Sequence, residues 1–390
     1  MSADTLLHWT LHDGRPASAL WRSESAMPAP KRVQLVDDTL PADKAYKLAC
    51  EGTGLLWNGD FQNARHLLQA LTRRLDKHTG PRRGATPATA QDTTSAGQAF
   101  HKHRQSQGHR ARILGMLLIP FNADHTIPLR RAPDVRQACT EGYGPGTQPY
   151  VTSLRELLGL IGAHEWRKKG VAIEALHGHG SGRIHAHYGV FSPLRGEYVD
   201  LVKQAPLPKG LQEAFDVGTG SGVLAAVLAS RGVPRITATD QDARALACAQ
   251  DNLHRLKLDK QVSVIEADLF PPGQAALIVC NPPWLPARPS SPIEYAVYDP
   301  DSRMLRGFLS GLKAHLAPGG EGWLIMSDLA EHLGLRGPDE LQGWIREAGL
   351  TVIGKLDARP RHAKAQDADD PLHQARAAEV TSLWRLAASA

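Results

Sequence analysis

Ala214-Phe-Asp-Val-Gly-Thr-Gly-Ser-Gly-Val-Leu-Ala-Ala-Val-Leu-Ala229 leads from a short apolar run through three glycines into an Ala/Leu/Val-rich helix pattern. This order predicts the strand, glycine-rich turn and helix of a nucleotide-binding α/β unit. The third glycine, Gly222, comes one residue earlier than in the dinucleotide fingerprint. The turn is therefore less suited to a pyrophosphate than to a smaller group.

Further strands and helices alternate after this turn. The apolar patterns predict strands over 235–240, 262–268, 275–280 and 321–326, and helices over 243–256, 304–316 and 341–349. Polar motifs follow several of these strands, at the carboxyl ends where open parallel sheets bind their ligands. The last two strands, 351–357 and 379–386, are separated by the polar loop 359–377, which has no amphipathic helix pattern. We expect them to form an antiparallel hairpin at the edge of the sheet.

The first half of the chain predicts a separate α+β domain. With 390 residues, two domains are the natural expectation. We place them at 1–187 and 188–390. Strand and turn patterns reach residue 38, and the later predictions are helices over 42–51, 61–77 (with Asp60 as N-cap) and 150–164, a strand over 113–119, and a hairpin of 171–176 with 183–191.

Residues 78–109 contain almost no large apolar side chains, which predicts a flexible basic loop. Basic residues exceed acidic ones across and beside it: Arg73, Arg74, Lys77, Arg82, Arg83, Lys102, Arg104, Arg110 and Arg112. Two interpretations stay open, a solvated insert and a contact to a phosphate backbone.

Composition excludes some classes of protein. No apolar run is long enough to span a bilayer, and the N-terminus has no secretory leader pattern. The four scattered cysteines predict a cytoplasmic protein with no disulfide framework and no cysteine zinc site. The net charge of +5 is a mild indication of an anionic partner. A hairpin rich in histidine (His177, His179, His185 and His187) lacks an adjacent carboxylate or cysteine, so we expect no metal.

With these motifs placed, residues 206–390 resemble the class I S-adenosylmethionine-dependent methyltransferases. The likeness is carried by Asp216 and the glycine turn, by Asp240 after the second strand, by Ala267-Asp-Leu-Phe270 after the third, and by Asn281-Pro-Pro-Trp284 after the fourth. The chain is most similar to the small-domain group, which includes the glutamine methyltransferases of release factors and several RNA N-methyltransferases. The resemblance implies a Rossmann-like seven-stranded sheet with an antiparallel C-terminal hairpin.

The resemblance also implies S-adenosylmethionine as cofactor. Asp216 would accept from its ammonium group, Asp240 would take both ribose hydroxyls, and Asp268 would accept from the adenine amine. The other positions implied to bind the cofactor are Gly218, Thr219, Gly220, Gly222, Gln241, Leu269 and Asn281.

Asn281, Pro282, Pro283 and Trp284 are the implied catalytic segment. A planar NH2 group is a poor nucleophile, but it offers two hydrogens. The Asn281 side-chain oxygen and the Pro282 carbonyl can each accept one of them. The prolines stiffen the segment, and Trp284 offers a flat face for stacking. The group's usual fourth residue is Tyr or Phe, so Trp284 is a departure that bears on the choice of acceptor more than on the reaction.

Tyr188, Phe191 and Glu197 are candidate substrate residues, with plain domain packing as the alternative. We expect an N-methyltransferase whose acceptor is an RNA base, with a protein glutamine as the alternative. A third possibility is a non-catalytic module that binds S-adenosylmethionine.

Overall fold

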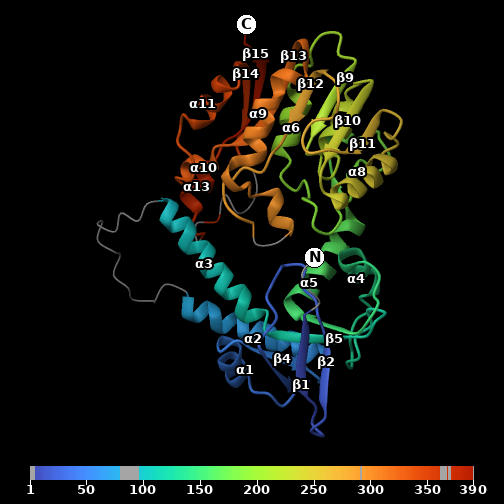
Figure 1. Ribbon diagram of the computed structural model, residues 1–390, viewed down its shortest axis with the longest axis vertical. Helices are drawn as coiled ribbons and strands as arrows, with labels where there is room; N and C mark the ends of the chain where they lie inside the picture. The colour runs from blue at the N-terminus through green and yellow to red at the C-terminus, as the bar shows by residue number, and fades with distance from the viewer. Residues whose placement is uncertain (1–4, 80–95, 290–291, 361–366, 368–369, 390) are drawn as a thin grey trace, which may run out of the picture. The chain divides into compact units, whose positions relative to one another are not determined.

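A computed structural model describes residues 5–79, 96–289, 292–360, 367 and 370–389 (Figure 1). The chain divides into two compact units, Met1–Thr94 with His101–Glu165, and Ser95–Phe100 with Trp166–Ala390. The main division thus falls after Glu165, whereas the pattern of the sequence placed it after residue 187. The histidine-rich segment belongs to the C-terminal unit.

The C-terminal unit is built on a seven-stranded sheet in the order β11-β10-β9-β12-β13-β15-β14. Its strands are β9 (Glu213–Val217), β10 (Arg235–Asp240), β11 (Val262–Glu266), β12 (Ala275–Cys280), β13 (Leu316–Ser327), β14 (Leu350–Ala358) and β15 (Thr381–Ala388). The strands from β11 to β13 pair in parallel, and β15 pairs antiparallel with both β13 and β14. The predicted Rossmann-like sheet with an antiparallel C-terminal hairpin is confirmed.

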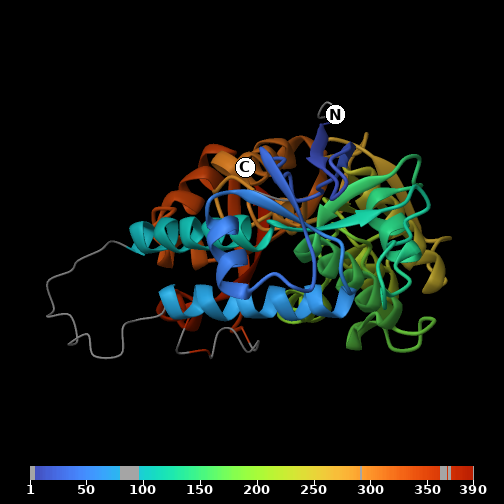
Figure 2. The same ribbon diagram turned by 90° about the horizontal axis from the view of Figure 1, so that it is seen from below.

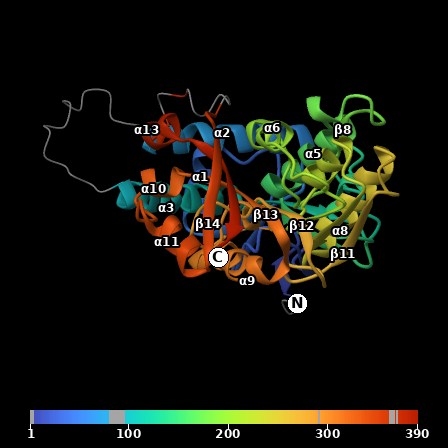
Figure 3. The same cartoon turned by 90° about the horizontal axis from the view of Figure 1, so that it is seen from above.

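Helices cover both faces of this sheet. They are α6 (Glu197–Gln204), α7 (Val223–Ser230), α8 (Ala243–Arg255), α9 (Arg303–His315), α10 (Leu329–His332), α11 (Glu340–Glu347) and α13 (His373–Ala378), with 3-10 turns at Glu174–Leu176, Pro292–Ala296 and Pro300–Ser302. One buried apolar cluster joins α6, α7 and α8 to the sheet, and another joins α9 and α11 to its opposite face. Figure 3 shows α6 on one side of β12 and β13, and α9 with α11 on the other. Strands buried on both faces explain why the sequence reads as continuous apolar runs.

The N-terminal unit contains a six-stranded mixed sheet in the order β1-β2-β6-β5-β4-β3. Its strands are β1 (Leu6–Thr10), β2 (Pro16–Trp21), β3 (Arg32–Val36), β4 (Thr53–Trp57), β5 (Leu117–Phe121) and β6 (Tyr150–Ser153). Strands β3, β4 and β5 are parallel, and β6 is antiparallel to β5. The predicted α+β character of this part is confirmed. Among the helices that the structure describes, none is long and apolar enough to cross a membrane.

The helices of the N-terminal half are α1 (Ala42–Cys50), α2 (Phe61–Thr79), α3 (Ala96–Leu114), α4 (Arg136–Tyr143) and α5 (Leu154–Lys169). The first two were predicted, and Asp60 caps α2 as expected because its Oδ1 accepts from the Gln62 N–H at 2.9 Å. Helices α2 and α3 are seen lengthwise in Figure 2, in light blue and cyan.

The predicted loop 78–109 is wrong over residues 96–109, which form most of α3. Its Ala, Gln, Lys and Arg residues are good helix formers, although they give no apolar stripe. The single large apolar side chain in this stretch, Phe100, is buried among Leu285, Leu329 and Leu333 of the C-terminal unit. Residues 80–95 lie outside the described part of the chain.

Several boundaries also differ from the predictions. Ile113 and Leu114 end α3, and the strand expected there begins only at Leu117. The helix expected from residue 150 begins at Leu154, after β6. The expected hairpin shrinks to β7 (Val171–Ala172) paired with β8 (Arg183–Ile184). The polar loop before β15 contains the short helix α13, and β13 begins at Leu316, before the predicted strand 321–326. Around residues 113 and 150 a short apolar run fits strand and helix equally well, and tertiary packing decides.

Candidate functional site

The glycine turn connects β9 to α7 with left-handed backbone at all three glycines, whose φ angles are 72°, 55° and 80°. A Cβ at Gly218 would collide with Met304 Cε, and one at Gly222 would lie 3.1 Å from Ala249 Cα. At Gly220 a Cβ would meet nothing within 4 Å. The outer two glycines therefore allow close packing, whereas the middle one presents its backbone to open space.

Asp240 ends the neighbouring strand β10 and is hydrogen bonded to this open part of the turn. Its Oδ2 accepts from the Gly220 N–H at 3.0 Å, and its Oδ1 accepts from the Asp242 N–H at 3.0 Å. Because each carboxylate oxygen can accept a second hydrogen bond, Asp240 retains acceptor capacity beside Gly220. Partial burial raises the pKa of this carboxyl above its usual value.

Asp216 lies inside the turn rather than on its open side. Its side chain is 1% exposed, and Oδ2 accepts from Thr219 Oγ1 at 2.7 Å and from the Ala225 N–H at 3.0 Å. These bonds join β9, the turn and the first turn of α7. Burial raises the pKa of Asp216 to about 6, because desolvation disfavours the carboxylate more than the two hydrogen bonds favour it.

Asn281 follows the last residue of β12, next to the glycine turn. Cys280 is in register with Val217, so Asn281 and Gly218 leave adjacent strands at the same level. Asn281 Oδ1 accepts from the indole Nε1–H of Trp284 at 2.9 Å. The short Asn-Pro-Pro-Trp segment thus closes on itself.

Trp284 is half-buried and packs against both apolar clusters of the sheet. The Arg195 guanidinium lies 5.9 Å from the centre of its ring. The backbone carbonyl oxygen of Trp284 accepts a hydrogen bond from Arg336 Nη2 at 3.3 Å. Ring, indole N–H and carbonyl therefore each contact a different residue.

The remaining predicted cofactor residues lie at the ends of β10 and β11. Asp268 is exposed and forms an ion pair with Arg303 at 3.2 Å. Gln241 is exposed, next to Asp240. Leu269 has a left-handed backbone with φ 77°, and its carbonyl accepts from Thr239 Oγ1.

The predicted substrate residues have separate surroundings. Tyr188 lies 5.9 Å from the Arg244 guanidinium, and Phe191 packs against the apolar cluster of α6 and α7. Glu197 begins α6 and is buried, with no hydrogen bond to its Oε1 from the residues that the structure describes. These contacts leave both interpretations of the three residues open.

Arg195 and Glu379 form a contact that the sequence did not indicate. The Glu379 side chain is completely buried, and its Oε1 accepts from Arg195 Nη1 at 3.2 Å and from Ser327 Oγ at 2.7 Å. Burial raises the pKa of Glu379. The pair fixes the segment before α6 to the start of β15, beside Trp284. Two isolated charges 184 positions apart carry no local pattern, so only the fold brings them together.

The histidine-rich segment is engaged in ordinary hydrogen bonds. His185 Nδ1 lies 2.7 Å from the Arg167 carbonyl oxygen, and His187 Nε2 lies 3.2 Å from Asp251 Oδ2. Within the described ranges, no cluster of three or more His, Cys, Asp or Glu residues could hold a metal ion.

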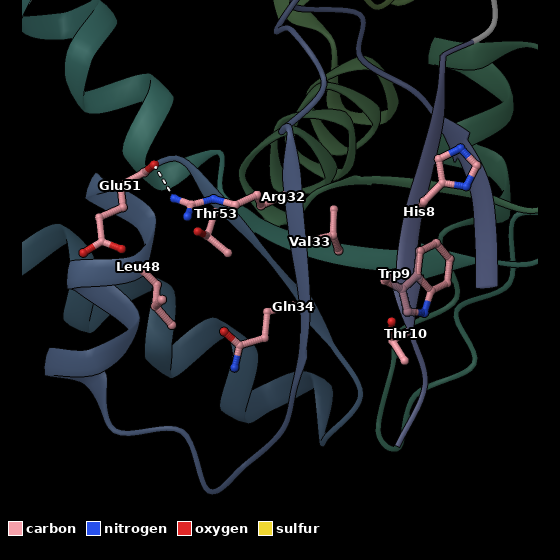
Figure 4. A pocket seen from close by; sticks show the side chains of 9 residues that line it. All are labelled: His8, Trp9, Thr10, Arg32, Val33, Gln34, Leu48, Glu51 and Thr53. Atoms are coloured by element: carbon pink, nitrogen blue, oxygen red, sulfur yellow. Dashed lines mark hydrogen bonds between the residues drawn. The ribbon is translucent and has the colours of Figure 1, made fainter. Parts of the chain in front are cut away.

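A pocket in the N-terminal unit contains none of the predicted site residues (Figure 4). Side chains from β1 and β3, the two outermost strands of that sheet, face it, and Arg32 Nη2 donates to the Glu51 carbonyl at 3.3 Å. Its lining residues are His8, Trp9, Thr10, Arg32, Val33, Gln34, Leu48, Glu51 and Thr53. The glycine turn and Asn281 therefore remain the candidate site.

Fold and site together define a Rossmann-like domain with a nucleotide-type turn and an Asn-Pro-Pro-Trp segment. Residues 181–333 match the family model described as "Methyltransferase small domain". This match confirms the predicted resemblance, the class of methyltransferases, and S-adenosylmethionine as the cofactor of that class.

Curated relatives resemble part of the chain. The release factor glutamine methyltransferase of Rhodopirellula baltica is 34% identical over 23% of this chain and 32% of its own length. The tRNA1(Val) (adenine(37)-N6)-methyltransferase of Shewanella loihica is 30% identical over 36% of this chain and 61% of its own length. The chain thus spans less than two thirds of either relative. A solved ribosomal protein L11 methylase from Lactobacillus delbrueckii subsp. bulgaricus aligns with a TM-score of 0.37 and 16% identity, over 53% of this chain and 86% of that one.

The residues of this site fit such a cofactor. Open space in front of Gly220 allows a ligand to approach the backbone, and the spare acceptor capacity of Asp240 suits hydroxyl donors at the same place. Asp216 Oδ2 accepts two hydrogen bonds from within the protein, and the role of this carboxyl toward the cofactor ammonium stays a prediction.

Proposed function

We propose that this protein is an S-adenosylmethionine-dependent N-methyltransferase that acts on a planar amino group, most favourably the exocyclic amine of an RNA base. The observation that carries the proposal is the placement of Asn281 at the end of β12, level with Gly218 of the glycine turn. An acceptor oxygen and an open cofactor-type turn thereby lie on adjacent strands of one sheet. A cytoplasmic location is part of the same proposal.

For the cofactor, we propose that Asp240 binds the ribose hydroxyls and that Gly218, Thr219, Gly220 and Gly222 form the wall beside the methionine end. Gln241, Asp268 and Leu269 are proposed to border the adenine. Asp216 would act mainly by bracing the turn, since its Oδ2 already bonds Thr219 and Ala225. When bound, the cofactor supplies an electrophilic methyl group.

For the reaction, we propose that Asn281 Oδ1 and the Pro282 carbonyl oxygen each accept one N–H of the acceptor group. Two acceptors fix the plane of the amino group and hold its nitrogen in one orientation. During methylation the nitrogen loses conjugation with its ring or carbonyl and becomes more positive. The two oxygens stabilise this charge where it develops, and the nitrogen then releases its excess proton to water.

RNA is favoured over protein because of the basic helices α2 and α3. Exposed Arg73, Lys77 and Lys102 lie on them, with Arg112 near the end of α3. Basic side chains in this number suit a phosphate backbone. A protein glutamine remains the second candidate, since its amide presents the same planar NH2 group, and one relative is named for that reaction.

The first test is transfer of radiolabelled methyl from S-adenosylmethionine to macromolecules of the host, separated into RNA and protein. Label in RNA, recovered as an N-methylated base after digestion, is the expected result. Label only in protein would overturn the RNA acceptor and support glutamine.

The catalytic role of the segment is tested with Asn281→Ala. We expect kcat to fall by about 10² to 10³, the usual effect of removing one group that stabilises transition-state charge. Cofactor affinity, measured by calorimetry, should change much less than kcat. Asn58→Ala, an exposed asparagine of the N-terminal unit, is the matched control and should retain full activity. Full activity in Asn281→Ala would overturn the catalytic role of Asn281, whereas a wild type without methyl transfer would favour a non-catalytic module that binds S-adenosylmethionine.

A further inference from the structure

The contact between Trp284 and Asn281 fixes the orientation of the catalytic amide. An indole N–H can only donate a hydrogen bond, so the Asn281 atom that faces it at 2.9 Å must be the oxygen. The two ends of an asparagine amide are otherwise hard to distinguish in a structure. Here the chemistry of the neighbour decides, and Oδ1 is held toward the ring with one acceptor position remaining.

Trp284 is itself held in place from other directions. Arg195 lies over the ring, and this arginine is fixed by the completely buried Glu379. The Trp284 carbonyl accepts from Arg336, whose side chain is 2% exposed and which also lies 3.6 Å from Glu331. The Arg336 bond holds the Trp284 backbone, and rotation of the indole would disturb its contacts with Arg195 and both apolar clusters, so the ring can serve as a fixed support for Asn281.

We propose that Trp284 is a positioning residue, whose indole N–H sets the Asn281 carboxamide so that Oδ1 accepts a single N–H from the methyl acceptor. This inference rests on the proposed function. It assigns the tryptophan a task that a phenylalanine cannot perform, because a phenyl ring has no donor. It also differs from a stacking role, because packing on both apolar clusters and the position of Arg195 already occupy much of the indole surface.

The kinetic test compares Trp284→Phe with Trp284→Ala. For a positioning role, Trp284→Phe should lower kcat about tenfold, the effect of losing one hydrogen bond of typical strength, while KM for the acceptor changes less than twofold. For a stacking role, Trp284→Phe should match the wild type and only Trp284→Ala should raise KM, which would overturn the proposal.

Trp323→Phe is the matched control. Its indole Nε1 also donates to a side-chain oxygen, that of Glu321 at 3.1 Å, but it lies within β13. We expect it to lower stability and leave kcat unchanged. A tenfold loss of kcat in this control as well would mean that removal of any buried indole donor has the same effect, and the proposal would fail.

A second readout does not depend on catalysis. The indole 1H–15N resonance of Trp284, assigned by its absence from Trp284→Phe, should shift in Asn281→Ala and exchange faster with solvent. In Asn281→Asp, which keeps an acceptor oxygen, the slow exchange should be largely restored. An unchanged resonance in Asn281→Ala would show that the contact is absent in solution.

The double variant Asn281→Ala/Trp284→Phe completes the test. If Trp284 acts through Asn281, the second substitution should add less than twofold to the loss caused by the first. Losses that multiply would assign Trp284 an independent role. Absence of transferase activity from the wild type would overturn the proposed function, whereas an active enzyme with an unchanged indole resonance overturns the role of Trp284 alone.

Discussion

At the scale of single residues, Asp216 and Asp240 lie on adjacent strands but in opposite surroundings. Asp240 keeps acceptor capacity beside the open backbone of Gly220, whereas Asp216 is enclosed. We expect Asp240→Asn to weaken S-adenosylmethionine binding roughly ten- to hundredfold, since a hydrogen bond to a charged group contributes about 1.5–3 kcal/mol. Isothermal titration calorimetry measures this. Asp242→Asn, which removes a nearby exposed charge and keeps a helix-capping side chain, should bind like the wild type; equal weakening in both would point to a general charge effect.

The enclosed carboxyl of Asp216 predicts a dependence of stability on pH. Its folded-state pKa of about 6 lies above the usual 3.8, so the folded protein binds the proton more tightly than the unfolded chain. Stability from this group is therefore full at low pH and is lost as pH rises from about 4 through about 6. Relative to Asp216→Asn, which does not titrate, the wild type should lose about 1 kcal/mol of unfolding free energy between pH 5 and pH 7.5. Denaturant titrations at both pH values measure the difference, and a difference that grows in favour of the wild type would contradict the assigned pKa.

At the scale of elements, the first half of α3 buries one large apolar side chain, that of Phe100. Phe100 is 2% exposed and lies in the apolar cluster of Leu285, Leu329 and Leu333. Phe100→Ala should lower the free energy of unfolding by about 3–5 kcal/mol, the usual cost of deleting a buried phenyl ring. Gln105→Ala, at an exposed position of the same helix, should change it by less than about 0.5 kcal/mol. If both variants were equally stable, residues 96–109 would behave as the loop that their composition suggested.

The elements that could be predicted are those with local patterns. The glycine turn and the apolar runs were enough to predict the strands of the C-terminal sheet. The position of Asn281 could be predicted because this residue directly follows β12. The first part of helix α3 was missed because its buried apolar residue, Phe100, packs on residues 185 or more positions away in the sequence. The same holds for Arg195 and Glu379, and for Asp216, whose enclosure depends on how α7 follows the turn. The donor role of the Trp284 indole follows from a side-chain geometry that the motif does not encode.

At the scale of the whole molecule, the net charge of +5 supports RNA binding only if basic side chains cluster on one part of the surface. Exposed Arg73, Lys77 and Lys102 on α2 and α3 form one set, and exposed Lys31, Lys44 and Lys47 elsewhere in the N-terminal unit form a matched control. We compare the two triple replacements by alanine, one in each set, which remove the same positive charge.

If RNA is the acceptor, replacing Arg73, Lys77 and Lys102 should weaken RNA binding and reduce the slope of log affinity against log salt by about 2–3, roughly one per lost phosphate contact. The control triple should leave that slope near the wild-type value, because none of its lysines lies on α2 or α3. Fluorescence anisotropy with labelled host tRNA, from 50 to 300 mM salt, is the measurement. Equal losses would indicate a diffuse charge effect. A wild-type affinity that barely depends on salt would argue against a phosphate-backbone contact and favour the protein glutamine. The glutamine amide is uncharged, so it gives no salt-dependent attraction to the basic side chains of α2 and α3.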